Sequence, residues 1–246
     1  MSSTSETGHA KNVANFATLH TFILGYGEAY NPSKESLKAA MIQGLVTSSQ
    51  NSLELVNTAE AANKVASDIR RNAFDPLSAL CSRLSGAIEA SDALPQTVEG
   101  VKAVIRKIRG VRTSSKLTDE EKAALIAAGK EVNEISAAQT SFDNRIDNLD
   151  KLIKLLVAAG FNPNEAELKT EALNTLLARL KALNSDVVSS EANLKNARLQ
   201  RNQLLYTDET GLVDVAAKAK SYIKSLFGAS SVQYNQVSGL EFRAYN

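Results

Sequence analysis

The chain contains few residues that break helices or cross-link a fold. Its 246 residues include one cysteine, no tryptophan, four prolines and twelve glycines. The single cysteine, Cys81, excludes an intramolecular disulfide and offers no cysteine spacing for a metal ion. Sparse helix breakers, together with abundant Ala, Leu, Lys and Glu, favour helix over strand. We therefore predict an all-α fold.

Long hydrophobic runs and excess charge of one sign are also absent. Purely apolar runs such as residues 155–159 are far shorter than the roughly 20 residues of a membrane-spanning helix. Residues 1–12 are polar and lack the apolar core of a signal peptide. The formal net charge of +1 implies no polyanionic partner. From these absences we expect a soluble chain with no transmembrane segment, located by default in the cytoplasm.

The sequence shows no recognisable catalytic or cofactor-binding constellation. The turn at residues 25–27, Gly-Tyr-Gly, lacks the strand and the third glycine of a dinucleotide-binding loop. Cys81 lies in an amphipathic segment without an evident histidine partner, and no Glu-x-x-His pair marks a di-iron bundle. We therefore predict that the protein is not an enzyme and that it has no cofactor and no metal site.

The most regular stretch is an apolar seam between residues 173 and 204. Its members recur at alternating steps of three and four residues, the spacing of a coiled-coil seam. Asn162-Pro163 lies just upstream, and proline suits the first turn of a helix, so the predicted helix begins near residue 164 and ends near residue 205. The seam consists of Leu173, Leu176, Leu180, Leu183, Val187, Ser190, Leu194, Ala197, Arg201 and Leu204.

A second seam with the same spacing precedes it, between Leu125 and Leu156. The acidic residues after Thr118 fit a helix N-terminus, and Gly160 fits a C-terminal cap. The connection between the two runs is short. We therefore expect helices at residues 118–159 and 164–205 to fold back on each other as an antiparallel hairpin of near-equal arms.

The first half of the chain is similar to the second and is interpreted as a diverged copy of it. Residues 31–38, Asn-Pro-Ser-Lys-Glu-Ser-Leu-Lys, match residues 162–169, Asn-Pro-Asn-Glu-Ala-Glu-Leu-Lys, at an offset of 131. The predicted fold is thus two tandem related antiparallel bundles, residues 1–113 and 114–246, built on long coiled-coil-like hairpins. Besides the hairpin at 118–205, helices are expected at residues 8–24, 33–73, 76–91, 96–109 and 210–227, with a short segment at 232–242.

Four polar residues fall on these seams and are candidates for burial: Arg70, Arg201, His9 and His20. Arg70 and Arg201 share one seam position in the two copies. Their guanidinium groups are expected either to grip a carboxylate or a bound anion, or to complement a helix C-terminus and reach water. The two histidines are eleven residues apart, too far for one metal ion. They are expected to be either a pH-sensitive pair inside the bundle or two histidines that are hydrogen-bonded or exposed at its edge.

A basic run crosses the junction between the two copies. A phosphate-bearing partner, either nucleic acid or an anionic lipid surface, is one candidate ligand for such a patch. No aromatic residue is interleaved for base stacking, and acidic residues flank the run, which favours a solvated helix face. The candidate anion contacts are Lys102, Arg106, Lys107, Arg109, Arg112 and Lys116.

Three groups of residues resemble a group of uncharacterised all-helical bacterial proteins. These are residues 8–12 (Gly-His-Ala-Lys-Asn), the paired Asn-Pro turns, and residues 224–240, which include Lys-Ser-Leu-Phe-Gly-Ala and Gln-Tyr-Asn-Gln-Val-Ser-Gly-Leu. The resemblance implies a bacterial setting and transfers no activity, cofactor or site.

We expect a non-enzymatic helical scaffold or protein–protein interaction module, whose partner is either another protein or a second copy of this chain. The first long seam carries Ser49, Ser52 and Asn63 where the second carries Leu180, Leu183 and Leu194, so it needs cover from another helix or another chain. The alternatives are an anion or nucleic-acid binder that uses residues 102–116, and a membrane-active bundle.

Overall fold

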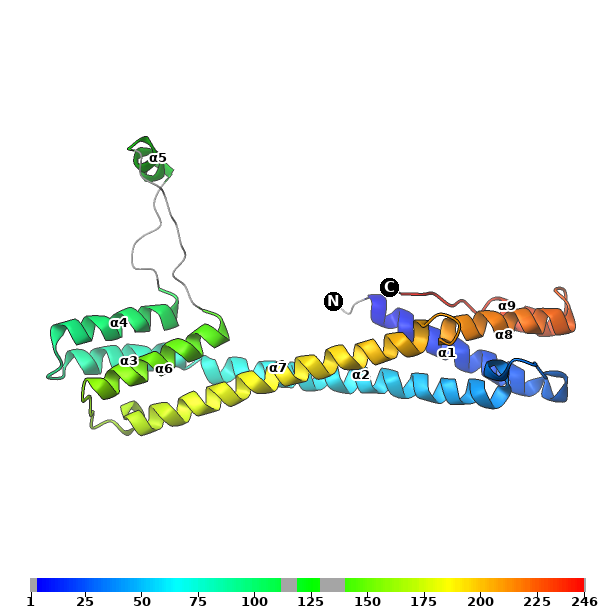
Figure 1. Cartoon of the computed structure of the whole chain (residues 1–246), viewed down its shortest axis with the longest axis horizontal. Coiled ribbons are helices and arrows are strands. Elements are labelled where there is room, and N and C mark those ends of the chain that lie inside the picture. Colours follow the sequence, from blue (N-terminus) through cyan, green and yellow to red (C-terminus); the bar gives the residue numbers. More distant parts are fainter. Residues whose placement is uncertain (1–3, 112–118, 129–139, 246) are drawn as a thin grey trace. The chain divides into compact units, whose positions relative to one another are not determined.

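The computed structural model describes residues 4–111, 119–128 and 140–245, and every regular element in these ranges is helical (Figure 1). The prediction of an all-α fold is confirmed for these residues. The α-helices are α1 (Thr4–Gly25), α2 (Ala39–Phe74), α3 (Leu77–Glu89), α4 (Pro95–Arg109), α5 (Asp119–Ala127), α6 (Phe142–Ala158), α7 (Thr170–Tyr206), α8 (Leu212–Phe227) and α9 (Val232–Ser238). Short 3₁₀ turns are η1 (Gly27–Ala29), η2 (Glu35–Leu37) and η3 (Ala166–Leu168).

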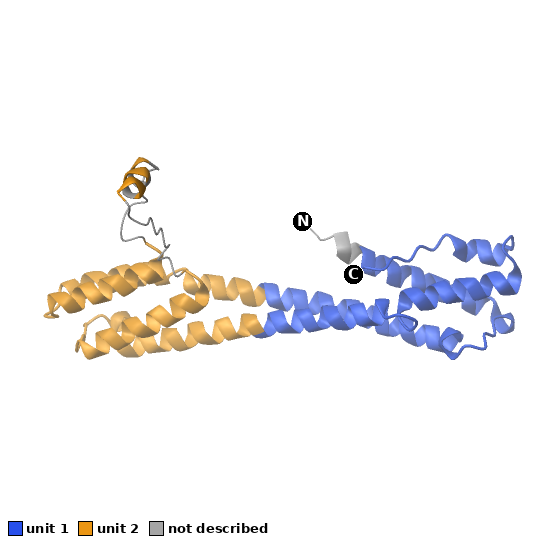
Figure 2. Cartoon of the chain, turned by 45° about the horizontal axis from the view of Figure 1, so that its top comes forward, with its two compact units in different colours: residues 1–64, 189–246 blue, residues 65–188 orange. Residues whose placement is uncertain are grey.

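The chain divides into two compact units, and the boundary falls inside α2 and α7 (Figure 2). Unit 1 comprises residues 1–64 and 189–246, and unit 2 comprises residues 65–188. This division differs from the expected contiguous segments 1–113 and 114–246. The reason is the length of the two long helices, because each one contributes its two ends to different units.

Unit 2 is built around one apolar core, which the end of α2, helices α3, α4 and α6, turn η3 and the start of α7 enclose. Helix α4 packs against both α3 and α6. Gly110 ends α4 in the left-handed conformation (φ 68°), which glycine adopts without steric cost. The side chains with the least exposure are Phe74, Leu77, Cys81, Leu84, Ile88, Val101, Ile108, Leu149, Leu152, Leu156, Leu173 and Leu180.

Unit 1 has its own core, formed by α1, the start of α2, the end of α7, and helices α8 and α9. Helix α8 packs against α1 and α9. The core side chains with the least exposure are Phe16, Leu19, Ile23, Ile42, Leu205, Leu212, Ala216, Ala219, Ile223 and Val237. Within this unit α2 also contacts α7 through a small cluster of Val56, Leu194 and Ala197.

The expected hairpin of near-equal arms is wrong. Helix α6 begins only at Phe142, where the Ser141 side chain accepts a hydrogen bond from the Asn144 N–H and caps the helix. It is 17 residues long, whereas α7 has 37 residues, so α6 covers only the first part of the α7 seam. The later part of that seam contacts α2 instead, as the hydrogen bond from Ser190 Oγ to Asn63 Oδ1 (3.0 Å) shows. Residues 129–139 of the expected arm lie outside the described residues.

The long helices begin six residues later than the Asn-Pro turns predict. In both cases a 3₁₀ turn comes first, and then a lysine in extended conformation, Lys38 (ψ 143°) or Lys169 (ψ 147°), precedes the α-helix. The last residue of each 3₁₀ turn, Leu37 or Leu168, is buried in its unit. The chain therefore anchors each helix start by burial of a leucine rather than by proline at the first helical position.

Candidate functional site

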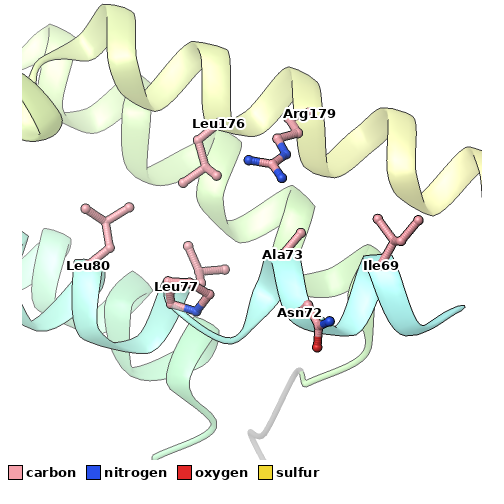
Figure 3. A pocket seen from close by; sticks show the side chains of 8 residues that line it. Ile69, Asn72, Ala73, Leu77, Leu80, Leu176 and Arg179 are labelled. Atoms are coloured by element: carbon pink, nitrogen blue, oxygen red, sulfur yellow. The ribbon is translucent and has the colours of Figure 1, made fainter. Parts of the chain in front are cut away.

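A groove lies at the corner where α2 meets α3, beside the start of α7 in unit 2 (Figure 3). Its volume is about 380 Å³, within the lower range of ligand pockets. Figure 3 shows Leu176 and Arg179 extending from α7 toward this corner. The groove is lined by Ile69, Asn72, Ala73, Pro76, Leu77, Leu80, Leu176 and Arg179.

The local sequence explains why this corner is hollow. Phe74 and Leu77 flank the turn, and both side chains are buried in the core, which fixes the angle between α2 and α3. Pro76 precedes the first residue of α3 and makes no demand for a backbone N–H partner. Ala73 faces the groove but has only a methyl group, so the space between Ile69 and Leu176 stays open.

The groove is apolar along its floor and positively charged at one rim. Ile69, at one end of the groove, is 46% exposed, whereas Leu176 and Leu80, toward the other end, are partly buried (Figure 3). Arg179 is exposed, and within the described ranges no hydrogen bond or ion pair joins it to another residue. An apolar floor with one unpaired guanidinium can accept an aliphatic side chain together with a carboxylate.

Next to the groove, unit 2 contains a layer of polar and aromatic contacts around Arg70. The Arg70 Nη1 donates to the Asn184 Oδ1 (2.9 Å), and the Asn184 Nδ2 donates to the Asp143 Oδ1 (2.8 Å). The Arg70 guanidinium also lies 4.0 Å above the centre of the Phe142 ring, a cation–π arrangement. Among the described residues, Arg70 therefore reaches an acidic side chain only through Asn184, and Arg70 itself is half-buried.

Aromatic rings continue this layer toward the core. Phe74 and Phe142 make an edge-to-face pair with ring centres 4.8 Å apart. Arg145 lies 5.2 Å from the centre of the Phe74 ring, and its Nη2 donates to the Phe74 carbonyl (3.0 Å). Burial lowers the pKa of Arg145 below its usual value. Asn184 and Arg145 cannot be recognised as contact residues from the sequence, because nothing in the seam spacing distinguishes them from solvated residues.

Arg201, the seam counterpart of Arg70, is almost fully buried in unit 1. Its Nε and Nη2 donate to the Asn202 Oδ1 at 3.1 Å and 2.9 Å. Both arginines thus make hydrogen bonds to asparagine amides. Within the described part of unit 2, no hydrogen bond joins Arg70 to a candidate anion contact on α4.

The two histidines lie at different places in unit 1. His9 is buried, and its Nδ1 shares a hydrogen bond of 2.5 Å with the Tyr206 hydroxyl. His20 is also buried, and its Nε2 has no hydrogen-bond partner in the described part of the chain. Desolvation lowers the pKa of His20 below its usual 6.5, and a hydrogen bond with the Ala39 backbone offsets this only in part.

We expect acid to destabilise unit 1 through His20. The unfolded chain takes up a proton near pH 6.5, whereas the folded unit does so only at lower pH, so the unfolded state holds more protons below pH 6.5. The free energy of unfolding should fall by up to about 1.4 kcal/mol per pH unit between pH 6.5 and the lowered pKa. Thermal unfolding at pH 8, 6 and 5 should show this loss in the wild type and a smaller loss in His20→Ile. Equal losses in both chains would rule out His20 as the cause.

The basic run is partly neutralised by its own surroundings. Lys102 forms an ion pair with Glu89 and a second with Glu99 (3.6 Å), and these carboxylates raise its pKa. Among the described residues of the run, Lys107 and Arg109 are exposed and Arg106 is half-buried on α4. Arg112 and Lys116 lie outside the described residues. Anion binding by this run stays a prediction. Within the described residues it depends on Arg106, Lys107 and Arg109, because Lys102 is paired with carboxylates.

Cys81 is a core residue. It is fully buried between helices of unit 2, and burial raises the pKa of its thiol to about 11, so it is protonated at neutral pH. Within the described ranges, no cluster of three or more His, Cys, Asp or Glu side chains is arranged to hold a metal ion. None of the described helices combines the length and the apolar character that crossing a membrane requires.

Comparison of the chain with protein-family models, with curated proteins and with solved structures finds no match. The groove, the polar layer and the α4 face are therefore interpreted from their own geometry.

Proposed function

We propose that the protein is a non-enzymatic helical scaffold that binds a partner protein in the groove between α2, α3 and α7 of unit 2. The observation that carries this proposal is the groove itself, an apolar floor open to solvent beside an arginine that has no partner in the described chain. Surface apolar residues that gather around a concave site mark interaction surfaces more often than scattered ones do.

The chemistry of the groove favours an amphipathic segment with an acidic residue next to an aliphatic one. Ile69, Leu80 and Leu176 provide the contact for the aliphatic side chain. Arg179 provides two parallel N–H donors for a carboxylate, a geometry that selects carboxylate over a neutral amide. A helix laid along a groove presents such neighbours at spacings of three and four residues.

We also propose that the fold arose from two related copies. What supports this is the order of elements: η2 and α2 recur as η3 and α7 at an offset of 131 residues. The ends of α1 and α6 differ by 133, and the starts of α3 and α8 differ by 135. Buried positions correspond as well, for example Leu19 with Leu152, and Ile42 with Leu173.

On this proposal each compact unit combines the first half of one copy with the second half of the other. Unit 1 takes α1 and the start of α2 from the first copy, and the end of α7, α8 and α9 from the second. The groove then reflects a difference between the copies. Ala73 corresponds to Leu204, and Arg179 corresponds to Ser48, so the equivalent position in unit 1 has a larger side chain and no cation.

The test is to fill the groove. We expect Ala73→Leu to close the space between Ile69 and Leu176 without loss of secondary structure, because its counterpart Leu204 is tolerated in unit 1. Helical peptides selected from an amphipathic library for binding to the wild-type chain should lose at least about tenfold in affinity for this variant. Arg179→Glu should shift the selected peptides from acidic to basic residues.

The matched control is Ala178→Leu, which adds the same atoms at an exposed position of α7 outside the groove. It should leave peptide binding unchanged. If the library yields no peptides that distinguish the wild type from Ala73→Leu, the groove is not a binding site.

A further inference from the structure

In unit 1, residues 240–245 follow α9 in a non-helical conformation and lie against α1 and α8. Three side chains from those helices hold the main chain of this segment. Asn12 grips Arg243 twice, since its Nδ2 donates to the Arg243 carbonyl (2.7 Å) and its Oδ1 accepts the Arg243 N–H (3.0 Å). Asn15 Nδ2 donates to the Glu241 carbonyl (2.7 Å), and Lys220 Nζ donates to the Leu240 carbonyl (2.8 Å).

Two aromatic side chains of the segment, three residues apart, dock on α1. Phe242 makes an edge-to-face contact with the buried Phe16, at 6.4 Å between ring centres. Tyr245 packs against His9, at 5.2 Å, and against Tyr206 at 6.1 Å. A Cβ at Gly8 would overlap the Tyr245 ring, so the ring lies directly against the backbone of α1 at this residue.

This arrangement is that of a bound peptide. Side chains of α1 and α8 make hydrogen bonds with main-chain donors and acceptors of the segment, and such bonds can form with any extended peptide. The two aromatic contacts add selectivity for particular side chains. The segment is not sealed in place, because a cavity of about 600 Å³ opens between α8 and residues 240–243. A tethered ligand of this kind occupies its site at a local concentration on the order of millimolar, so a free copy can compete with it at that concentration.

We propose that the α1–α8 face of unit 1 is a binding site for an extended peptide with two aromatic residues three positions apart. Residues 240–245 occupy it as an exchangeable ligand, and its ligand in trans is the same segment of a second copy of this chain. The inference deepens the proposed role as an interaction module by adding self-association. The site lies entirely in unit 1. A result that contradicts peptide binding there therefore leaves the proposed binding to the unit 2 groove untouched, and the reverse also holds.

Exchange of the segment can be measured in the full chain, because the sequence has no tryptophan. In the variant Tyr245→Trp the single indole reports whether the segment is docked. Adding a synthetic peptide of residues 239–246 should displace the segment and shift the indole emission to longer wavelength, with a midpoint at about millimolar peptide. A further Phe242→Ala substitution in the chain weakens only the tethered copy, so the midpoint should fall about tenfold.

Two controls in the Tyr245→Trp background separate docking from general destabilisation. Asn12→Ala removes the main-chain grip, so the indole should be solvent-exposed before any peptide is added, whereas Asn235→Ala on the exposed face of α9 should change nothing. A peptide with the order of residues scrambled should not shift the emission. If a variant fails to fold, hydrogen exchange of the Arg243 amide in the unaltered chain gives the same information, because displacement frees this N–H from Asn12.

The second copy as ligand is tested by complementation. An Asn12→Ala chain keeps the segment but lacks the grip, and a Phe242→Ala chain keeps the grip but has a weakened segment. Mixed at about 0.5 mM of each, they should form a one-to-one complex by light scattering, while each alone stays monomeric. A mixture as monomeric as its components overturns the second copy as ligand. Peptide that changes neither the indole emission nor the Arg243 exchange overturns the binding site itself.

Discussion

Replacing Phe74 by alanine should lower the free energy of unfolding of unit 2 by about 3–5 kcal/mol. Phe74 is 1% exposed and closes the α2 end of the core, so the substitution leaves a cavity that the surrounding helices fill only in part. It also removes the edge-to-face contact with Phe142 and the ring below Arg145. Arg145 keeps its hydrogen bond to the main-chain carbonyl of residue 74 but loses its cation–π partner.

Urea unfolding followed by circular dichroism, with hydrogen exchange to assign the loss to unit 2, measures this effect. The matched control is Leu55→Ala on the exposed side of α2, where the side chain is 48% exposed and the expected change is within about 0.5 kcal/mol. A loss for Phe74→Ala below about 1 kcal/mol would mean that the Phe74 side chain contributes little to the stability of the unit 2 core.

The second large effect is expected at Asn184. Asn184→Ala removes the acceptor of Arg70 Nη1 and the donor to Asp143 Oδ1, and hydrogen bonds to charged groups contribute about 1.5–3 kcal/mol each. Asp143 is exposed and regains water, so most of the cost comes from Arg70, whose Nε is already buried with no hydrogen-bond partner among the described residues. We expect unit 2 to lose about 2–3 kcal/mol.

The polar layer can be exchanged for an apolar one as a check on this reasoning. Replacing both partners, Arg70→Met with Asn184→Leu, should recover most of the stability that Asn184→Ala loses, because no buried group is then left unpaired. The control Asn193→Ala, at an exposed position of α7, should be close to neutral. A double substitution as unstable as Asn184→Ala would show that packing rather than polar pairing sets the cost.

The sequence predicts some of the residues that make the contacts described above, but not those of the groove or of the site that residues 240–245 occupy. Arg70 and Arg201 were identifiable because they interrupt an apolar seam. Asn12 and Arg179 do not interrupt one, and their roles depend on segments that approach them from far along the chain. A signal for the groove was available in the paired copies, since Ala73 stands where the second copy has Leu204. The smaller side chain at residue 73 indicates an open space in unit 2 only once it is known which helices pack around that residue.

What the sequence determined by itself is local. Apolar spacing, scarce prolines and glycines, and the short turns place helices α1, α2, α3, α4, α7, α8 and α9 within six residues of their observed bounds, because each helix is stabilised by hydrogen bonds between near neighbours. The spacing also extended α6 upstream to residue 118, although the Ser141 cap starts the helix at Phe142. Tertiary structure alone decided that α7 shares its seam between α6 and α2. A seam with a repeat of 3.5 residues fits any partner with the same repeat, so which helix is buried against which depends on the summed packing of each unit and not on any one segment.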